Sequence, residues 1–230
     1  MPAAWGTRAF ARFTLERNWA GAESDFHRAL ELGPTDLETM DSYSNYLTVR
    51  GRHAEAIEVS RRAEERGPLS VAAARQVAWA YYMAKQYDAA IQQLRRTLEI
   101  EPQYTPAHTL LGRAHLLKGN FAEAIRELEK AGEGYEDMLA LGYAMAGQRA
   151  IAERLLADIL SASYRHPVIP YEVALVYVAL ADNDRALEWL ERANRERDPA
   201  FIQIRVDPMV DLLRSDSRFG ALRAQLDLQP

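Results

Sequence analysis

The stretch YDAAIQQLRRTLEIEP, residues 87–102, has an alanine at its fourth position and ends in a proline, and this pattern recurs along the chain. WAGAESDFHRALELGP occupies residues 19–34, and HAEAIEVSRRAEERGP occupies residues 53–68. FAEAIRELEKA begins at residue 121, and weaker copies begin at residues 149 and 183. The matching alanines lie 34 residues apart, except for one step of 28: Ala22, Ala56, Ala90, Ala124, Ala152 and Ala186. Such a fixed period is the signature of a repeat protein.

A second helical pattern lies upstream of each alanine block. In VAAARQVAWAYYMAKQ, residues 71–86, apolar residues recur every three or four positions, as they do on one face of a helix. Gly51, Gly119 and Gly147 each stand five residues before their alanine, where a helix is expected to end in a left-handed cap. Each unit is therefore predicted to be a helix, a tight turn and a second helix. Small residues at the contact let the two backbones approach closely.

This pattern resembles the tetratricopeptide repeat (TPR), a two-helix unit of about 34 residues. The resemblance implies an all-α fold, a right-handed superhelical solenoid of about six TPR-like helix-turn-helix units over residues 1–200. The units would start near residues 3, 37, 71, 105, 133 and 167. The family's small eighth position falls on Phe10 in the first unit, so we expect that unit to be irregular or shifted in register. The step of 28 predicts a shortened link near residues 132–137.

The tail, IQIRVDPMVDLLRSDSRFGALRAQL at residues 202–226, breaks the repeat. It predicts an extended piece to Val206, a short helix from about Pro208 to Leu213, and a final helix from about Asp216. Its sequence, with VDP at residues 206–208 and LRSDSRF at residues 213–219, resembles the end of TPR segments in larger bacterial proteins, where the repeats follow a cyclase, kinase or winged-helix domain. We expect residues 201–230 to form a C-terminal cap, because the exposed end of a solenoid needs one.

Composition excludes several kinds of protein and site. The chain has no cysteine, which removes disulfides, thiolate zinc sites and iron–sulfur clusters, and its formal charge of −5 gives no basic surface for nucleic acid. No apolar run approaches the roughly 20 residues that span a bilayer, and the first residues, MPAAWGTRAF, lack the basic-then-apolar pattern expected of a signal peptide. His108 and His115 would lie about 10 Å apart on one helix, too far to share a metal, so core packing is the better interpretation. We expect a cytoplasmic protein that is not an enzyme, binds no cofactor or metal, and contacts neither membrane nor nucleic acid.

The resemblance also implies where a partner would bind. In TPR solenoids the first helix of each unit lines the concave side, so the inward positions would form a groove for a peptide. We expect Trp79 and Tyr82 to be its anchors, with Arg75 and Arg113 making charge-assisted contacts, because aromatic and arginine side chains dominate many interfaces. The predicted groove residues are Asn45, Arg75, Trp79, Tyr82, Met83, Thr109, Arg113, Leu117, Met138 and Leu141.

The first functional hypothesis is therefore a non-catalytic module that binds a peptide or protein segment in the concave groove. One alternative is the sensory or regulatory part of a larger bacterial signalling or transcription-regulator protein. Another is a self-assembling scaffold, a homo-oligomer formed through the solenoid ends. The sequence leaves open which partner is bound and whether the tail fills the groove.

Overall fold

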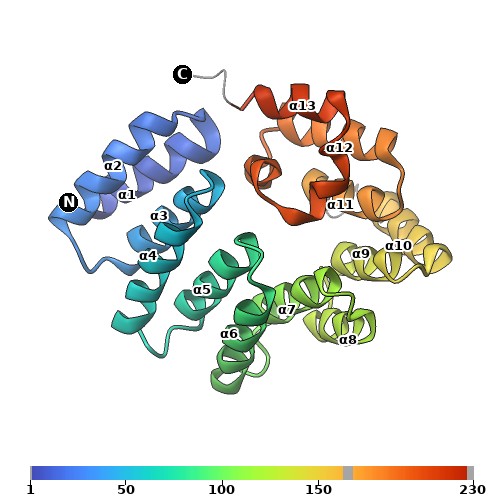
Figure 1. Cartoon of the computed structure of the whole chain (residues 1–230), viewed down its shortest axis with the longest axis horizontal. Coiled ribbons are helices and arrows are strands. Elements are labelled where there is room, and N and C mark those ends of the chain that lie inside the picture. The colour runs from blue at the N-terminus through green and yellow to red at the C-terminus, as the bar shows by residue number, and fades with distance from the viewer. Residues whose placement is uncertain (1, 163–167, 227–230) are drawn as a thin grey trace. The chain divides into compact units, whose positions relative to one another are not determined.

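The computed structural model describes residues 2–162 and 168–226, and all regular structure within these ranges is helical. Twelve α-helices form six consecutive pairs, and the two helices of a pair pack against each other (Figure 1). The first helices are α1 (Pro2–Ala11), α3 (Leu37–Val49), α5 (Val71–Met83), α7 (Thr105–Leu117), α9 (Glu136–Met145) and α11 (Pro170–Ala179). The second helices are α2 (Trp19–Leu32), α4 (His53–Arg66), α6 (Tyr87–Ile100), α8 (Phe121–Ala131), α10 (Arg149–Ala162) and α12 (Asn183–Arg195). The predicted helix-turn-helix units are confirmed.

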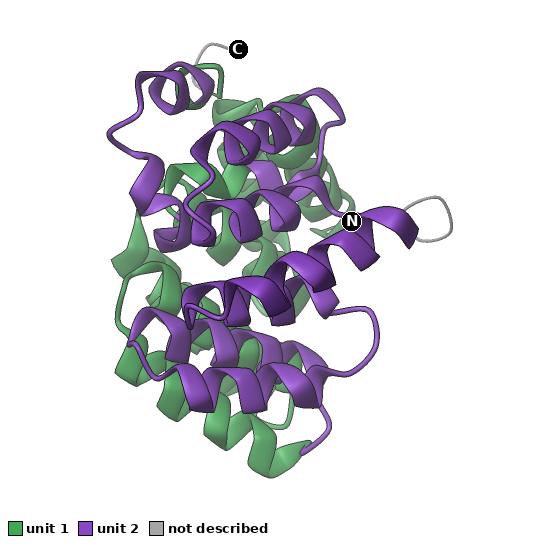
Figure 2. Ribbon diagram, turned by 90° about the vertical axis from the view of Figure 1, so that its right-hand side faces the viewer, with its two compact units in different colours: residues 1–101, 202–206, 223–230 green, residues 102–201, 207–222 purple. Residues whose placement is uncertain are grey.

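The chain divides into two compact units, which Figure 2 distinguishes by colour. Unit 1 consists of residues 1–101, 202–206 and 223–230, and contains α1 to α6. Unit 2 consists of residues 102–201 and 207–222, and contains α7 to α12. The tail thus contributes residues to both units. A domain boundary at residue 200 stays a prediction.

The alanine ladder lies at the contact within each pair. All six ladder alanines are fully buried. Gly112 shows how close the helices come: a Cβ added to it would lie 2.6 Å from Cγ of Leu128 on the partner helix α8. The repeat therefore fixes a small residue wherever two backbones meet, as close packing requires.

The first pair departs from the regular pattern, as expected from Phe10. After α1 the chain forms a π-helical turn, η1 (Arg12–Glu16), before α2 begins. A π-turn accommodates one extra residue, so the register of α1 shifts by one position. Ala9 is fully buried, whereas Phe10 is 43% exposed. Ala9 therefore takes the small position that a regular repeat would give to residue 10.

The shortened link is also visible. Helix α8 has 11 residues where α6 has 14, and α9 has 10 where α7 has 13. The two helices on either side of residues 132–135 thus share equally the six residues by which this step falls short of 34.

The tail differs from its prediction in one part. Residues Pro199–Arg205 form a 3-10 helix, η2, so the expected extended piece up to Val206 is wrong. The predicted short helix is present as η3 (Pro208–Leu213), and the final helix as α13 (Ser217–Ala224). The extended prediction failed because Ile202 and Ile204 alternate with polar residues, as in a strand, yet both are buried in the helical turn.

Each unit holds its share of the tail through specific contacts. In unit 1, the indole Nε1 of Trp19 donates to the carbonyl oxygen of Leu226 at 2.9 Å. The guanidinium of Arg205 lies 5.6 Å from the centre of the same indole ring, within cation–π range. In unit 2, η3 packs on α11, and Leu213 and Phe219 are fully buried. The tail is thus a folded part of both cores.

No helix in the described ranges is long and apolar enough to cross a membrane.

Candidate functional site

Unit 1 presents a row of side chains from its three first helices. Because Ala9, Ser44 and Ala78 occupy the buried small position, the residues that follow them point away from the helix contact. These residues are Phe10, Asn45 and Trp79, and each is exposed at least in part. We call Phe10, Asn45, Arg75 and Trp79, together with Asp41 and Gln76 beside them, the unit 1 face.

The indole ring of Trp79 packs on the buried ring of Tyr82. The two rings are stacked, with centroids 5.6 Å apart and planes inclined by 17°. Tyr82 is fully buried and Met83 nearly so, whereas Trp79 is half-buried. Of the aromatic residues predicted for the groove, Trp79 is therefore the one that reaches the surface, and Tyr82 fixes its position.

Phe10 is a surface residue that the predicted groove did not include. It lines a pocket between α1 and α3, together with Ala3, Gly6, Thr7, Asp36, Glu38, Thr39 and Ser42. Its ring also packs edge-on against that of Phe13, 5.4 Å away, which limits its movement. The signal that could have placed it is Ala9, a small residue one position earlier that fits the buried position better than phenylalanine.

Buried polar atoms of the unit 1 face lack hydrogen-bond partners. Oδ1 of Asp41 on α3 and Nε2 of Gln76 on α5 are both inaccessible to solvent and unpaired among the described residues. Arg75 donates to Oε1 of Gln76 at 3.3 Å and lies near enough to Asp41 to favour its ionised form. Burial nevertheless raises the pKa of Asp41 to about 6. This face therefore holds one unsatisfied acceptor and one unsatisfied donor.

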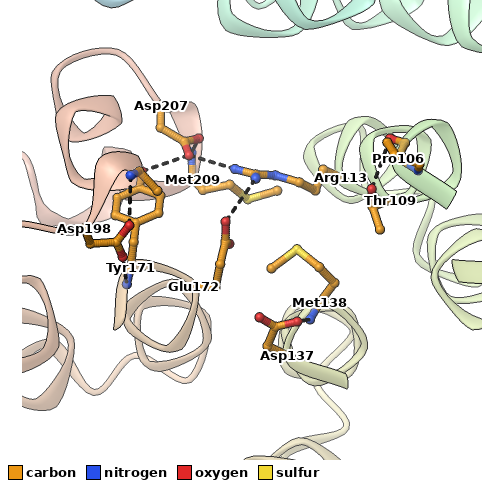
Figure 3. Close-up of polar contacts among 11 residues, drawn as sticks. Pro106, Thr109, Arg113, Asp137, Met138, Tyr171, Glu172, Asp198, Asp207 and Met209 are labelled. Atoms are coloured by element: carbon orange, nitrogen blue, oxygen red, sulfur yellow. Dashed lines mark hydrogen bonds and ion pairs between the residues drawn. The ribbon is translucent and has the colours of Figure 1, made fainter. Parts of the chain in front are cut away.

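In unit 2 the corresponding residues contact the tail. Nη2 of Arg113 on α7 pairs with Oδ2 of Asp207 at 2.7 Å, and the hydroxyl of Tyr171 on α11 donates to the same oxygen at 2.9 Å. The other oxygen of Asp207 accepts the backbone N–H of Met209 and so caps η3. Asp207 is fully buried, and Arg113 is 6% exposed. Figure 3 shows Arg113 reaching from α7 to the tail.

Two further carboxyls lie around this ion pair. Oε1 of Glu172 is 3.9 Å from Nη1 of Arg113, while its Oε2 is buried and has no partner in the described ranges (Figure 3). Burial, only partly offset by Arg113, raises the pKa of Glu172 to about 7. Burial also raises the pKa of Asp137 on α9. The guanidinium of Arg113 therefore interacts with three carboxyl groups, those of Asp207, Glu172 and Asp137. All of these partners belong to unit 2.

The ten predicted groove residues divide equally between the units. Asn45, Arg75, Trp79, Tyr82 and Met83 belong to unit 1. In unit 2, Arg113 pairs with the tail, Met138 and Leu141 are buried, Leu117 is half-buried, and the Thr109 hydroxyl donates to its own helix. That these residues bind a partner stays a prediction.

The two helix histidines are buried, as the packing interpretation predicted. Nδ1 of His108 lies 2.7 Å from a carboxylate oxygen of Glu127, and its Nε2 lies 2.9 Å from the carbonyl oxygen of Pro102. His108 thus fastens the start of α7 to α8. No cluster of three or more metal-ligating side chains occurs in the part of the chain that the structure describes.

Comparisons with known proteins agree with the helix pairs. The sequence profile of the tetratricopeptide repeat matches residues 44–105 and residues 81–140. A thermophilic TPR protein from Thermus thermophilus is similar in structure, with a TM-score of 0.63 and 21% identity over 78% of this chain and 97% of that one. A TPR protein from Parabacteroides merdae gives a TM-score of 0.57 and 15% identity over 99% of this chain and 93% of that one.

Among curated proteins, mouse Superkiller complex protein 3 is 28% identical over 157 residues. The match covers 66% of this chain but 10% of that protein, so this chain spans about a tenth of its length. The profile matches and the stacked helix pairs together identify the class: the chain belongs to the tetratricopeptide repeat family. Proteins of this family are in general modules that bind other proteins or peptides.

Proposed function

We propose that this chain is a non-catalytic interaction module that binds a segment of a partner protein on the unit 1 face. The observation that carries the proposal is Trp79, a half-buried indole held in place by a fully buried tyrosine. A rigid, partly exposed aromatic ring gives contact area at little cost in side-chain entropy, which is typical of residues that dominate binding. A cytoplasmic location and the absence of a cofactor belong to the same proposal.

Arg75 supplies the polar part of this contact. Its guanidinium makes one described hydrogen bond, a long one to Gln76, and it is half-buried beside Trp79. A carboxylate or carbonyl of the partner can therefore accept a charge-assisted hydrogen bond from Arg75 without breaking a strong internal ion pair. Arg113 differs in this respect, because releasing it from Asp207 would leave a buried charge unpaired. The proposal accordingly places binding on unit 1.

The test removes the indole. Replacing Trp79 with alanine is expected to weaken binding by about 2 kcal/mol or more, roughly 30-fold, while leaving the fold intact. Trp189→Ala is the matched control, because Trp189 is also half-buried but lies on the second helix α12 of unit 2. Immobilised wild type and both variants would be incubated with lysate of the source organism, and retained proteins identified by mass spectrometry.

Proteins kept by wild type and Trp189→Ala but lost by a folded Trp79→Ala protein support the proposal. Equal retention by all three, or loss with both variants, contradicts it. Circular dichroism spectra and unfolding midpoints check that each variant is folded.

The regulator alternative rests on the resemblance of the tail to those of larger bacterial proteins. In unit 2 the residues that carry this resemblance have packing roles: Asp207 caps η3 and pairs with Arg113, while Leu213 and Phe219 fill the core. A cap is sufficient to explain them, so the interaction module is the function that we favour. Self-assembly through the solenoid ends is the remaining alternative, and light scattering at several concentrations tests it.

A further inference from the structure

In unit 2, two carboxyl groups compete for the guanidinium of Arg113. Nη2 of Arg113 donates to Oδ2 of Asp207 at 2.7 Å, whereas Oε1 of Glu172 lies 3.9 Å from Nη1 (Figure 3). Asp207 is fully buried and also accepts the hydroxyl of Tyr171 and the backbone N–H of Met209. Oε2 of Glu172 is buried and has no hydrogen-bond partner within the described ranges. While the tail is docked, Asp207 is therefore the stronger partner of Arg113.

The charged groups that act on Glu172 are mostly acidic. Asp137 on α9, Asp198 between α12 and η2, and Asp207 in the tail each disfavour its ionised form, and Arg113 on α7 favours it. One guanidinium does not neutralise several carboxylates in a buried cluster, so a proton on Glu172 lowers the electrostatic cost. Burial, as the largest cause, and these acidic neighbours raise the pKa of Glu172 to about 7.

Undocking of the tail would change the partner of Arg113. Asp207 leaves the cluster, and Arg113 can then pair with Glu172, which remains beside it on α11. Such a pair stabilises the ionised form of Glu172. The docked state thus binds a proton at Glu172 that the undocked state releases. Docking is therefore favoured at low pH and weakened as pH rises between the ordinary pKa of 4.5 and about 7.

We propose that residues 207–213 form a pH-sensitive latch on unit 2, closed while Asp207 holds Arg113 beside a protonated Glu172 and opened when ionised Glu172 takes Arg113 over. Opening uncovers Val210 and Leu213, which are fully buried in the closed latch. An apolar surface of the tail is thus covered below neutral pH and becomes accessible more often above it. The latch lies within unit 2 and is independent of the binding proposed for unit 1.

Hydrogen exchange followed by mass spectrometry measures how often the latch opens. Wild type and Glu172→Gln are compared at the same pH, so the intrinsic exchange rate cancels. The variant keeps the shape of the protonated side chain and cannot ionise. The ratio of opening constants, wild type to variant, should be at least about tenfold larger at pH 8 than at pH 5.5 in peptides from the latch. Glu188→Gln, an exposed change on α12, is the matched control and should follow wild type.

A second variant, Asp207→Asn, tests the competition for Arg113. Asparagine can still accept the N–H of Met209, but it leaves the positive charge of Arg113 to Glu172 whether the latch is closed or open. Adding Glu172→Gln completes a double-mutant cycle. In the Asp207→Asn background, the effect of Glu172→Gln on opening should change less than about threefold between pH 5.5 and pH 8. If the tail no longer docks in this variant, the comparison of wild type with Glu172→Gln still decides.

A ratio that grows with pH in the latch, while peptides from α8 keep a constant ratio, supports the proposal. Equal growth in α8 means that Glu172 acts on the unfolding of all of unit 2, and a local latch is then wrong. A ratio that does not depend on pH also contradicts the latch. A pH dependence that persists undiminished in the Asp207→Asn background would show that Glu172 does not act by competing for Arg113.

Discussion

The tight turn inside each helix pair depends on one residue with a positive φ. It always stands five residues before the ladder alanine, and its φ lies between 57° and 77° in all six pairs. Glycine occupies the position in three pairs, as predicted, while Arg17, Lys85 and Ala181 occupy it in the others. This backbone conformation is unfavourable for residues with a Cβ, by about 1–2 kcal/mol, so the fold imposes it on three positions that glycine would suit better.

Ala181→Gly should therefore stabilise the protein. Glycine removes the Cβ clash but loses more backbone entropy on folding, and the net gain expected is about 0.5–1 kcal/mol. The free energy of unfolding from urea titration, followed by circular dichroism, measures it. The reverse change Gly147→Ala, at the same place in the preceding pair, should destabilise by a similar amount. A loss of stability in Ala181→Gly would contradict the assignment of strain to this turn.

At the scale of helices, the pairing could be predicted because the residues that determine it lie close together in the sequence. Ladder alanines, turn residues and small residues all repeat at one spacing, and each has a local physical reason. The position of Phe10 could not be predicted, because counting back from Ala22 assumes α-helix throughout and η1 inserts a π-turn. The contact of Arg113 with Asp207 joins residues 94 positions apart, and no period in the sequence relates them. The contact forms because the carboxylate of Asp207 is buried and needs a positively charged partner. That burial results from tertiary packing and cannot be inferred from the repeat.

The close approach of paired helices can be tested with two glycines. Gly112 on α7 has Leu128 and the backbone oxygen of Ala124 within 3.2 Å of an added Cβ, whereas Gly220 on α13 has nothing within 4 Å. Alanine favours a helix over glycine by about 1 kcal/mol, so Gly220→Ala should stabilise. Gly112→Ala gains the same propensity but must push α8 away, and we expect it to be less stable than Gly220→Ala by about 2 kcal/mol. Urea unfolding of both variants measures the difference, and equal stability would show that α7 and α8 tolerate separation.

At the scale of the whole molecule, buried carboxyls set the pH dependence of stability. Asp41 in unit 1 and Glu172 in unit 2 have pKa values raised by burial to about 6 and about 7, from ordinary values of 3.8 and 4.5. Between its two values such a group binds more protons in the folded state, so the free energy of unfolding falls as pH rises through that interval. Arg218 lowers the pKa of Asp216, and that stabilisation is lost only in more acidic solution. Through Asp41 and Glu172, the free energy of unfolding should therefore be higher at about pH 5 than at about pH 8.

Glu172→Gln tests this expectation, since glutamine keeps the shape of the protonated side chain and cannot ionise. Between about pH 5 and pH 8 the wild type should lose about 2–3 kcal/mol through Glu172, and the variant should lose correspondingly less. At about pH 5 the two proteins should differ little, because Glu172 is then mostly protonated in the folded state. Urea unfolding across this range gives the two curves, with the exposed change Glu188→Gln on α12 as control. Parallel curves for wild type and Glu172→Gln would mean that the carboxyl is ionised in the folded state throughout, with Arg113 compensating its burial beside Asp207.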